Sequence, residues 1–321
     1  MGQHHITPLE PLGVRQGVPR RRPGRWPDDL LAAYARASAV RGATKELTRK
    51  ERIIRDFLRV GRISHAADIT ASVVQDYIAE LVARGRAPRT VRCYHSAVRL
   101  FCRLLLDRGL IYGDPCAYTP LPAIEETAPR YLTEAEIGRL LPIARQAGIE
   151  IEVLVAINTG LRMSELRHLR WDAPVDLAGR TLIVRRAKGR RPRAIPLNGA
   201  ALAALTVQRE RYGHLSFVFP GGRGGHHHGQ VWDQDRPRSL TWWDRMALRP
   251  LQEQVPKFRE ARPGTVGSGW HLFRSTFASR LVQAGVSIFK VSVWLGHKSP
   301  ATTAAAYAIL APGYDPDIER L

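Results

Sequence analysis

The sequence is poor in cysteine and contains no long hydrophobic run. Three of its 321 residues are cysteine, and they show no Cys-X-X-Cys pairing: Cys93, Cys102 and Cys116. So few thiols argue against a disulfide framework and favour a reducing compartment. No stretch approaches the roughly 20 apolar residues of a membrane-spanning helix. The opening residues MGQHHITPLEP lack the apolar centre of a secretory signal, so we expect a soluble chain of the cytoplasm, or of the nucleoid within it.

The usual signatures of cofactor and metal binding are missing as well. There is neither a GxxxxGK[ST] phosphate loop nor a paired-carboxylate metal motif. Three consecutive histidines, residues 226–228, lie between glycines, and a mobile polar loop explains them better than a metal site does. We therefore expect chemistry that uses no cofactor, no metal ion and no ATP.

Acidic residues are scarce relative to basic ones. The chain has 49 Lys and Arg residues against 29 Asp and Glu residues, which gives a formal net charge of +20. Such an excess predicts a polyanionic partner. Charge alone does not separate a nucleic acid from an anionic membrane, but the lack of a spanning segment weighs against the membrane.

The length and the proline distribution predict two domains. A single hydrophobic core usually stops growing near about 250 residues, and this chain has 321. Residues 1–27 are rich in Arg and Pro, which predicts a flexible basic arm that either grips phosphate or is a plain solvated terminus. Residues 116–130 contain three prolines and no periodic pattern, as expected of a linker. The two domains are then residues 28–115 and residues 131–321.

Four helical patterns occupy residues 28–115. They begin at Pro27, at Thr48 with Glu51 as its capping-box partner, near Thr70 and at Pro88. Apolar residues recur at helical spacing, which predicts a small helical bundle with basic faces. An ordinary solvated face explains any one basic residue better than a nucleic-acid contact does. As a group, the candidates for such contacts are Arg89, Arg92 and Arg99.

Helices also predominate in residues 131–321, with one exception. Thr133 and Glu136 form another capping box at the start of this domain. The β-prone runs TLIVR, residues 181–185, and RAIPL, residues 193–197, flank a basic, Gly-containing turn and predict a hairpin. The fold class is therefore mainly α with a small β-hairpin or sheet. We expect a two-domain clamp made of an N-terminal helical bundle and a C-terminal α+β domain.

Four segments of the second domain carry polar residues suited to phosphate chemistry. Residues 157–171, INTGLRMSELRHLRW, predict two helices joined by a turn that presents an arginine. The hairpin presents a lysine at its tip. Residues 270–281, WHLFRSTFASRL, place a histidine and an arginine at i and i+3, and residues 293–310, VWLGHKSPATTAAAYAIL, add a histidine and a tyrosine. In chain order these residues are Arg162, Lys188, His271, Arg274, His297 and Tyr307.

Each segment alone is a weak signal, but the ordered set resembles the phage integrase, or tyrosine recombinase, family over about residues 28–310. The resemblance implies an enzyme that cleaves and rejoins double-stranded DNA at a recombination site and works there as a homotetramer. The two arginines would clamp the phosphate, and the tyrosine would be the nucleophile. The lysine and the two histidines would supply the remaining polar contacts.

Further positions follow or depart from the family pattern. Glu165 falls where the family often has an acidic residue that supports the site. Ser275 stands where a second histidine is common, which changes one supporting hydrogen bond and leaves the core chemistry intact. Tyr307 follows His297 by ten residues, whereas nine are common. Arg190 and Arg191, beside Lys188, are further candidates for DNA contacts.

The chemistry suits these residue types independently of the resemblance. Breaking a phosphodiester passes through a five-coordinate phosphorane whose oxygens gain charge, and guanidinium groups stabilise that charge with paired hydrogen bonds. A phenol needs a base or nearby positive charge before it attacks, and the departing 5′ oxygen needs a proton. Lys188 is the candidate acid, unless it is a phosphate contact like Arg190, Arg191 or Arg193. A phosphotyrosyl link keeps the energy of the broken bond, so religation needs no ATP.

Two other functions fit the same residues. A type IB topoisomerase or a telomere resolvase resembles this constellation, but the short helical N-terminal module favours recombination. A DNA-binding relative without catalysis is disfavoured because the polar residue set is complete.

Overall fold

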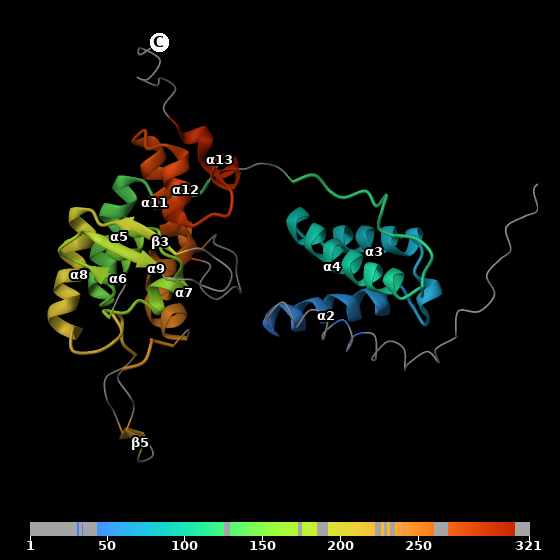
Figure 1. Cartoon of the computed structure of the whole chain (residues 1–321), viewed down its shortest axis with the longest axis horizontal. Helices are drawn as coiled ribbons and strands as arrows, with labels where there is room; N and C mark the ends of the chain where they lie inside the picture. The colour runs from blue at the N-terminus through green and yellow to red at the C-terminus, as the bar shows by residue number, and fades with distance from the viewer. Residues whose placement is uncertain are drawn as a thin grey trace, which may run out of the picture. The chain divides into compact units, whose positions relative to one another are not determined.

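The computed structural model describes Leu31, Tyr34 and most of the chain from residue 44 to residue 311. The gaps are residues 125–128, 173–174, 185–191, 222–225, 228–229, 232–234, 240 and 260–268. The chain divides into two compact units, Met1–Glu126 and Thr127–Leu321 (Figure 1). This division lies within the expected linker of residues 116–130. The expected arm of residues 1–27 lies outside the described residues.

The first unit is a helical bundle. Its elements are α2 (Thr44–Val60), the short 3-10 helix η1 (Ala66–Asp68), α3 (Ala71–Ala83) and α4 (Pro88–Asp107). The Thr70 hydroxyl accepts a hydrogen bond from the Val73 N–H and caps α3, and Pro88 is the first residue of α4, both as predicted. The expected start of a helix at Thr48 is wrong. The helix begins at Thr44, because the preceding Lys, Glu and Leu residues are good helix formers and extend it by one turn.

Aromatic and aliphatic side chains fill the core of this unit. The rings of Phe57 and Tyr77 meet edge to face at 5.2 Å, and both residues are buried. The Tyr77 hydroxyl donates to the Asp56 carboxylate at 3.0 Å, so its polar end is satisfied. Cys102 and Cys116 are buried free thiols whose sulfur atoms lie 4.0 Å apart.

The second unit combines many helices with a small sheet. Its helices are α5 (Glu134–Gln146), α6 (Glu150–Thr159), α7 (Met163–Arg167), α8 (Gly199–Tyr212), the π-helix η2 (Trp242–Leu248), α9 (Arg249–Gln254), α10 (Pro256–Arg259), α11 (Trp270–Gln283), α12 (Ile288–Leu295), α13 (Pro300–Tyr307) and the 3-10 helix η3 (Ala308–Leu310). The predicted capping box at the start of α5 is confirmed, with Thr133 and Glu136 each satisfying the other's backbone N–H.

The sheet contains the predicted hairpin and one further strand. Strands β1 (Val175–Asp176), β2 (Thr181–Val184) and β3 (Arg193–Pro196) form an antiparallel sheet in the order β1-β2-β3. Residues alternate between buried and exposed along β2 and β3, as expected of a sheet with one covered face. A second, two-stranded sheet pairs β4 (His226–His227) with β5 (Gln230–Val231), so the expected loop at the histidine run contains paired strands.

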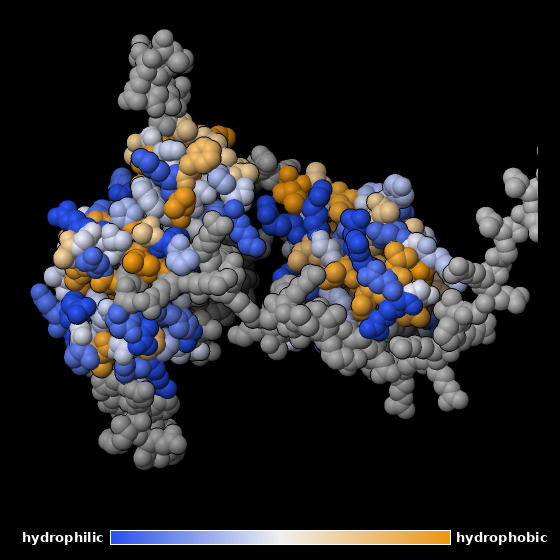
Figure 2. Space-filling view, viewed as in Figure 1, coloured by the Kyte–Doolittle hydropathy of each residue, from blue (hydrophilic) through white to orange (hydrophobic). Residues whose placement is uncertain are grey.

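Helix α6 lies at the centre of the second unit and packs against α5, α8 and α11. Trp270 of α11 meets Trp243 of η2 at 4.7 Å and Phe273 at 5.2 Å, and this aromatic group anchors the N-terminal end of α11 in the core. No helix within the described segments is both long and apolar enough to cross a membrane. Hydrophilic side chains cover much of the surface of each unit (Figure 2). Exposed large apolar side chains include Phe289 and Val293 of α12 and Ile309 of η3.

Candidate active site

The turn between α6 and α7 presents Arg162. Gly160 ends α6 in the left-handed conformation with φ of +61°, which favours glycine, and Arg162 is the N-cap of α7. The Glu165 carboxylate accepts from the Arg162 backbone N–H at 2.8 Å and from its Nη1 at 2.9 Å. One acidic side chain therefore caps the helix and orients the arginine. The side chain of Arg162 is 25% exposed, so it remains open to a ligand.

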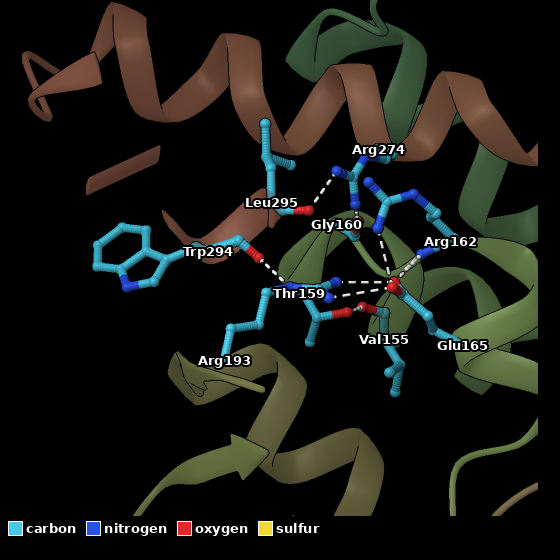
Figure 3. Close-up of polar contacts among 9 residues, drawn as sticks. All are labelled: Val155, Thr159, Gly160, Arg162, Glu165, Arg193, Arg274, Trp294 and Leu295. Atoms are coloured by element: carbon cyan, nitrogen blue, oxygen red, sulfur yellow. Dashed lines mark hydrogen bonds and ion pairs between the residues drawn. The ribbon is translucent and has the colours of Figure 1, made fainter. Parts of the chain in front are cut away.

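A second arginine, Arg193 of β3, binds the same carboxylate. Its Nη1 and Nη2 donate to the two Glu165 oxygens at 3.0 and 2.7 Å, and its Nε donates to the Trp294 carbonyl at 2.7 Å (Figure 3). Burial alone would raise the pKa of Glu165. The hydrogen bonds and charge of Arg193, joined by those of Arg162, outweigh burial and lower that pKa to about 2. Glu165 is therefore an anion held between two cations.

Arg274 of α11 is almost fully buried, with 2% of its surface exposed. Its Nη1 donates to the Gly160 carbonyl at 2.8 Å, and its Nη2 donates to the Leu295 carbonyl (Figure 3). These carbonyls lie at the C-terminal ends of α6 and α12, where helices carry partial negative charge. The positive guanidinium is therefore stabilised by both helix ends. Burial and repulsion from Arg162 lower the pKa of Arg274 to about 9, so it stays protonated at neutral pH.

His271 lies at the start of α11, three residues before Arg274, and is exposed. The protein packed around it lowers its pKa, and the positive charges of Arg274 and Arg162 lower it further. A histidine with a lowered pKa is neutral at neutral pH and can accept a proton. The charge of Arg162 acts on both His271 and Arg274, so these three residues share one site.

The segment around α12 and α13 brings a histidine and a tyrosine to this site. His297 follows Gly296, which ends α12 with φ of +65°, and its Nδ1 lies 2.7 Å from the Thr303 hydroxyl of α13. Tyr307 is the last residue of α13 and is 5% exposed. Its hydroxyl lies 3.4 Å from the Ser275 hydroxyl, and it lies close enough to Arg274 to influence that arginine's pKa. Ser275 thus contacts the tyrosine from the position next to Arg274.

Most of the residues singled out in the second domain gather in this one site. They are Arg162, Glu165, His271, Arg274, Ser275, His297 and Tyr307. Lys188, Arg190 and Arg191 lie outside the described residues. Within the described ranges, no cluster of three His, Cys, Asp or Glu side chains is arranged to hold a metal ion.

The candidate DNA-binding arginines of the first unit lie on exposed parts of α4. Arg92 donates to the Pro122 carbonyl at 3.0 Å, and Arg99 pairs with Asp114 at 3.2 Å. Arg89 is exposed at the start of the helix. These contacts leave the DNA-binding assignment of all three residues a prediction.

From the sequence, Arg193 is expected only as a candidate phosphate contact on the hairpin. The structure corrects this, because Arg193 is buried and binds Glu165 and the Trp294 carbonyl. The run RAIPL does contain a signal, because period-2 alternation places Arg193 on the same face as Ile195, and both are buried. A cation on the buried face of a strand requires a buried partner. The alternation therefore marks Arg193 as an internal arginine, although it does not identify Glu165 as the partner.

Comparison with known proteins gives a consistent picture. A family model described as "Phage integrase family" matches residues 130–312. The tyrosine recombinase XerC of Oceanobacillus iheyensis is 29% identical over 267 residues, covering 78% of this chain and 80% of that protein. The tyrosine recombinase XerD of Rhizobium meliloti is 29% identical over 303 residues, covering 86% and 90%.

Solved structures share the fold. The Tn1549 transposon integrase in complex with a circular intermediate DNA has a TM-score of 0.64 and 18% identity, covering 91% of this chain and 97% of that one. A lambda integrase dimer bound to a COC′ core site has a TM-score of 0.66 and 20% identity, covering 86% and 93%. Fold, site and relatives together define an enzyme that cleaves and rejoins DNA strands in site-specific recombination. Since the family model covers more than half of it, the chain belongs to the phage integrase family of tyrosine recombinases.

Proposed function

We propose that Tyr307 attacks a DNA phosphate held by Arg162 and Arg274 and forms a 3′-phosphotyrosyl link. The observation that carries this proposal is the placement of the Tyr307 hydroxyl beside Ser275, next to the buried guanidinium of Arg274. Repulsion between two neighbouring arginines is unfavourable, and a bound anionic phosphate relieves it. The pair is thus preorganised for the charge that develops on the phosphorane oxygens.

The remaining side chains supply proton transfer and orientation. His271 has a lowered pKa and is neutral, so it can take the phenolic proton as the Tyr307 oxygen bonds to phosphorus. The bond from phosphorus to the 5′ oxygen breaks in the same step, and Lys188, which lies in the sequence between β2 and β3, donates the proton that this oxygen needs. His297 is held by Thr303 and provides a further polar contact to the phosphate. A second DNA end then attacks the phosphotyrosyl bond and restores the phenol.

We further propose a double-stranded recombination site as the partner of both units. A net charge of +20 supports this, as do the exposed arginines of α4, Arg89, Arg92 and Arg99. In this proposal residues 28–115 are the DNA-binding module, residues 116–130 the linker and residues 131–321 the catalytic domain. Four copies act together on two DNA sites of the bacterial chromosome or of a mobile element, in the cytoplasm.

Formation of a covalent adduct tests the proposal. Duplexes with inverted repeats, taken from the DNA that flanks the gene and nicked beside each candidate cleavage position, trap the adduct because the short fragment diffuses away. We expect a denaturing gel to show protein bound to DNA in buffer that contains a chelator and no ATP. If no duplex from the flanking DNA gives an adduct, or if the adduct requires a divalent metal, the proposed function is wrong.

The role of Lys188 has a separate test. A 5′ alkoxide needs a proton to leave, whereas a 5′ thiolate leaves unaided. We expect Lys188→Ala to cleave an ordinary substrate very slowly and to regain most of its rate on DNA with a bridging 5′ sulfur. Arg162→Ala and Arg274→Ala are the controls, because their charge serves the nonbridging oxygens and sulfur gives no rescue. Equal slowness of Lys188→Ala on both substrates would make the lysine a phosphate contact.

A further inference from the structure

Arg193 occupies the site without being arranged to hold a substrate. Its side chain is 6% exposed, and all three of its nitrogens donate to protein groups, namely both oxygens of Glu165 and the Trp294 carbonyl (Figure 3). A guanidinium committed in this way is poorly placed to grip a phosphate from solvent. Its effect must therefore pass through the groups that it binds.

The charges around Glu165 show what that effect is. Arg162 and Arg193 each carry one positive charge, and the carboxylate between them carries one negative charge, so the three side chains have a net charge of +1. Among the described residues, the guanidiniums that bind the Glu165 carboxylate are those of Arg162 and Arg193, so loss of Arg193 would leave Glu165 paired with Arg162 alone. The net charge would then be zero, and the pair would offer a phosphate little attraction.

We propose that Arg193 is a positioning residue that neutralises Glu165, so that Arg162 keeps a net positive charge for the phosphate. This inference rests on the proposed function of the site, because it assigns to Arg162 the task of binding phosphate. Glu165 then orients Arg162 through two hydrogen bonds without cancelling its charge.

Local packing fixes Arg193 in this role. A Cβ atom at Gly296 would lie 2.9 Å from the Cδ of Arg193, so the backbone at the end of α12 packs directly on the arginine stem. The Nε bond to Trp294 satisfies a carbonyl of the last turn of α12. The side chain is therefore held at both ends of its guanidinium, on the carboxylate and on the helix terminus.

Variants that change the net charge of these three side chains, studied without DNA, test whether Arg193 neutralises Glu165. The net charge of the three side chains is zero in Arg193→Gln, +2 in Glu165→Gln and again +1 in the double variant. Because nearby positive charge lowers the pKa of His271, an NMR titration should find it lowest in Glu165→Gln, highest in Arg193→Gln, and similar in the double variant and the unaltered chain. A His271 pKa that does not follow this order would overturn the charge balance, whatever the chain does with DNA.

The rate of adduct formation tests the role, on the nicked duplex that gives an adduct with the unaltered chain. We expect Arg193→Gln to slow the reaction about 100-fold, the size of effect seen when one preorganised donor is lost. The double variant should recover to within about tenfold of Glu165→Gln alone, because Arg193 has no charge to neutralise once Glu165 is gone. A purely structural tether to Trp294 predicts instead that the double variant is as slow as Arg193→Gln.

If Arg193→Gln does not fold, the rates of adduct formation of the double variant and of Glu165→Gln still decide the question. A double variant more than about tenfold slower than Glu165→Gln would overturn the inference and leave the proposed function standing. The matched control is a second buried ion pair in the described part of this unit, Arg238 with Glu152. Arg238→Gln lowers stability in the same way, but its effect on the rate should be less than threefold once the protein is folded. No adduct with the unaltered chain would refute the proposed function instead.

Discussion

At the scale of single residues, Gly160 has a role both in the fold and in the candidate active site. Its left-handed conformation ends α6, its carbonyl holds Arg274, and it has no room for a side chain, because an added Cβ would lie 2.4 Å from the Phe277 ring. The sequence indicates the helix end, since glycine is the residue favoured there. It does not indicate the close approach of Phe277, which comes from a helix more than a hundred residues further along the chain.

Gly160→Ala should therefore be strongly destabilising. The left-handed conformation costs about 1 to 2 kcal/mol with a Cβ, and overpacking against Phe277 adds about 1 to 3 kcal/mol. Gly148→Ala is the control, since Gly148 has φ of +69° but nothing within 4 Å of an added Cβ. Tryptophan fluorescence during urea unfolding is the measurement, because six of the seven tryptophans lie in the second unit. Equal losses for the two variants would contradict the packing account.

Glu165 predicts a pH dependence of stability. Its pKa is lowered from 4.5 to about 2 in the folded protein, so between these values the unfolded chain binds a proton that the folded chain does not. The stabilisation, about 3 kcal/mol, is complete above about pH 4.5 and is lost as the pH falls through this window. Glu165→Gln should lower stability at neutral pH and flatten the loss between about pH 4.5 and 2. If Glu165→Gln loses as much unfolding free energy between about pH 4.5 and 2 as the unaltered chain does, the arginines do not stabilise the ionised carboxylate.

At the scale of elements, motif residues were easier to anticipate than their partners. Capping boxes, helix-ending glycines and alternation along a strand are local patterns, and they predicted α3, α4, α5 and the β2–β3 hairpin. The predicted start of α2 at Thr48 lies four residues after the observed start at Thr44, because the residues between them are good helix formers. Strand β1 was missed because two residues carry too little periodicity. The contact of Arg193 with Glu165 spans 28 residues, and only tertiary packing specifies it.

Helix α13 carries Tyr307 and depends on its cap. The Ser299 hydroxyl accepts from the Ala301 N–H at 3.2 Å, whereas Ser287, the corresponding residue of α12, makes no side-chain cap bond. Ser299→Ala should cost α13 about 1 kcal/mol, which corresponds to about fivefold faster local opening. Hydrogen exchange of the α13 amides is the measurement. Ser287→Ala should leave α12 unchanged, and an equal effect of both changes would show that the cap bond is unimportant.

At the scale of the whole molecule, charge governs the encounter with DNA. The excess of 49 basic over 29 acidic residues is distributed over both units. Each neutralised phosphate contributes a slope of ~0.9 to the fall of log affinity with log salt. We expect a slope steeper than about 3 in a fluorescence-anisotropy titration with the nicked duplex, because several phosphates are contacted together. A slope close to zero would mean that binding does not rest on phosphate contacts.

The central claim is that Tyr307 is the nucleophile of a site built by Arg162, Arg274 and Glu165. Its most direct test is to digest the covalent adduct with protease and locate the nucleotide-bearing tyrosine by mass spectrometry. The account predicts a single modified peptide containing Tyr307, and a Tyr307→Phe variant that still binds DNA but forms no adduct, since the change removes one oxygen and little packing. An adduct that maps to Tyr34, Tyr94, Tyr212 or Tyr314, or one that persists in Tyr307→Phe, would contradict it.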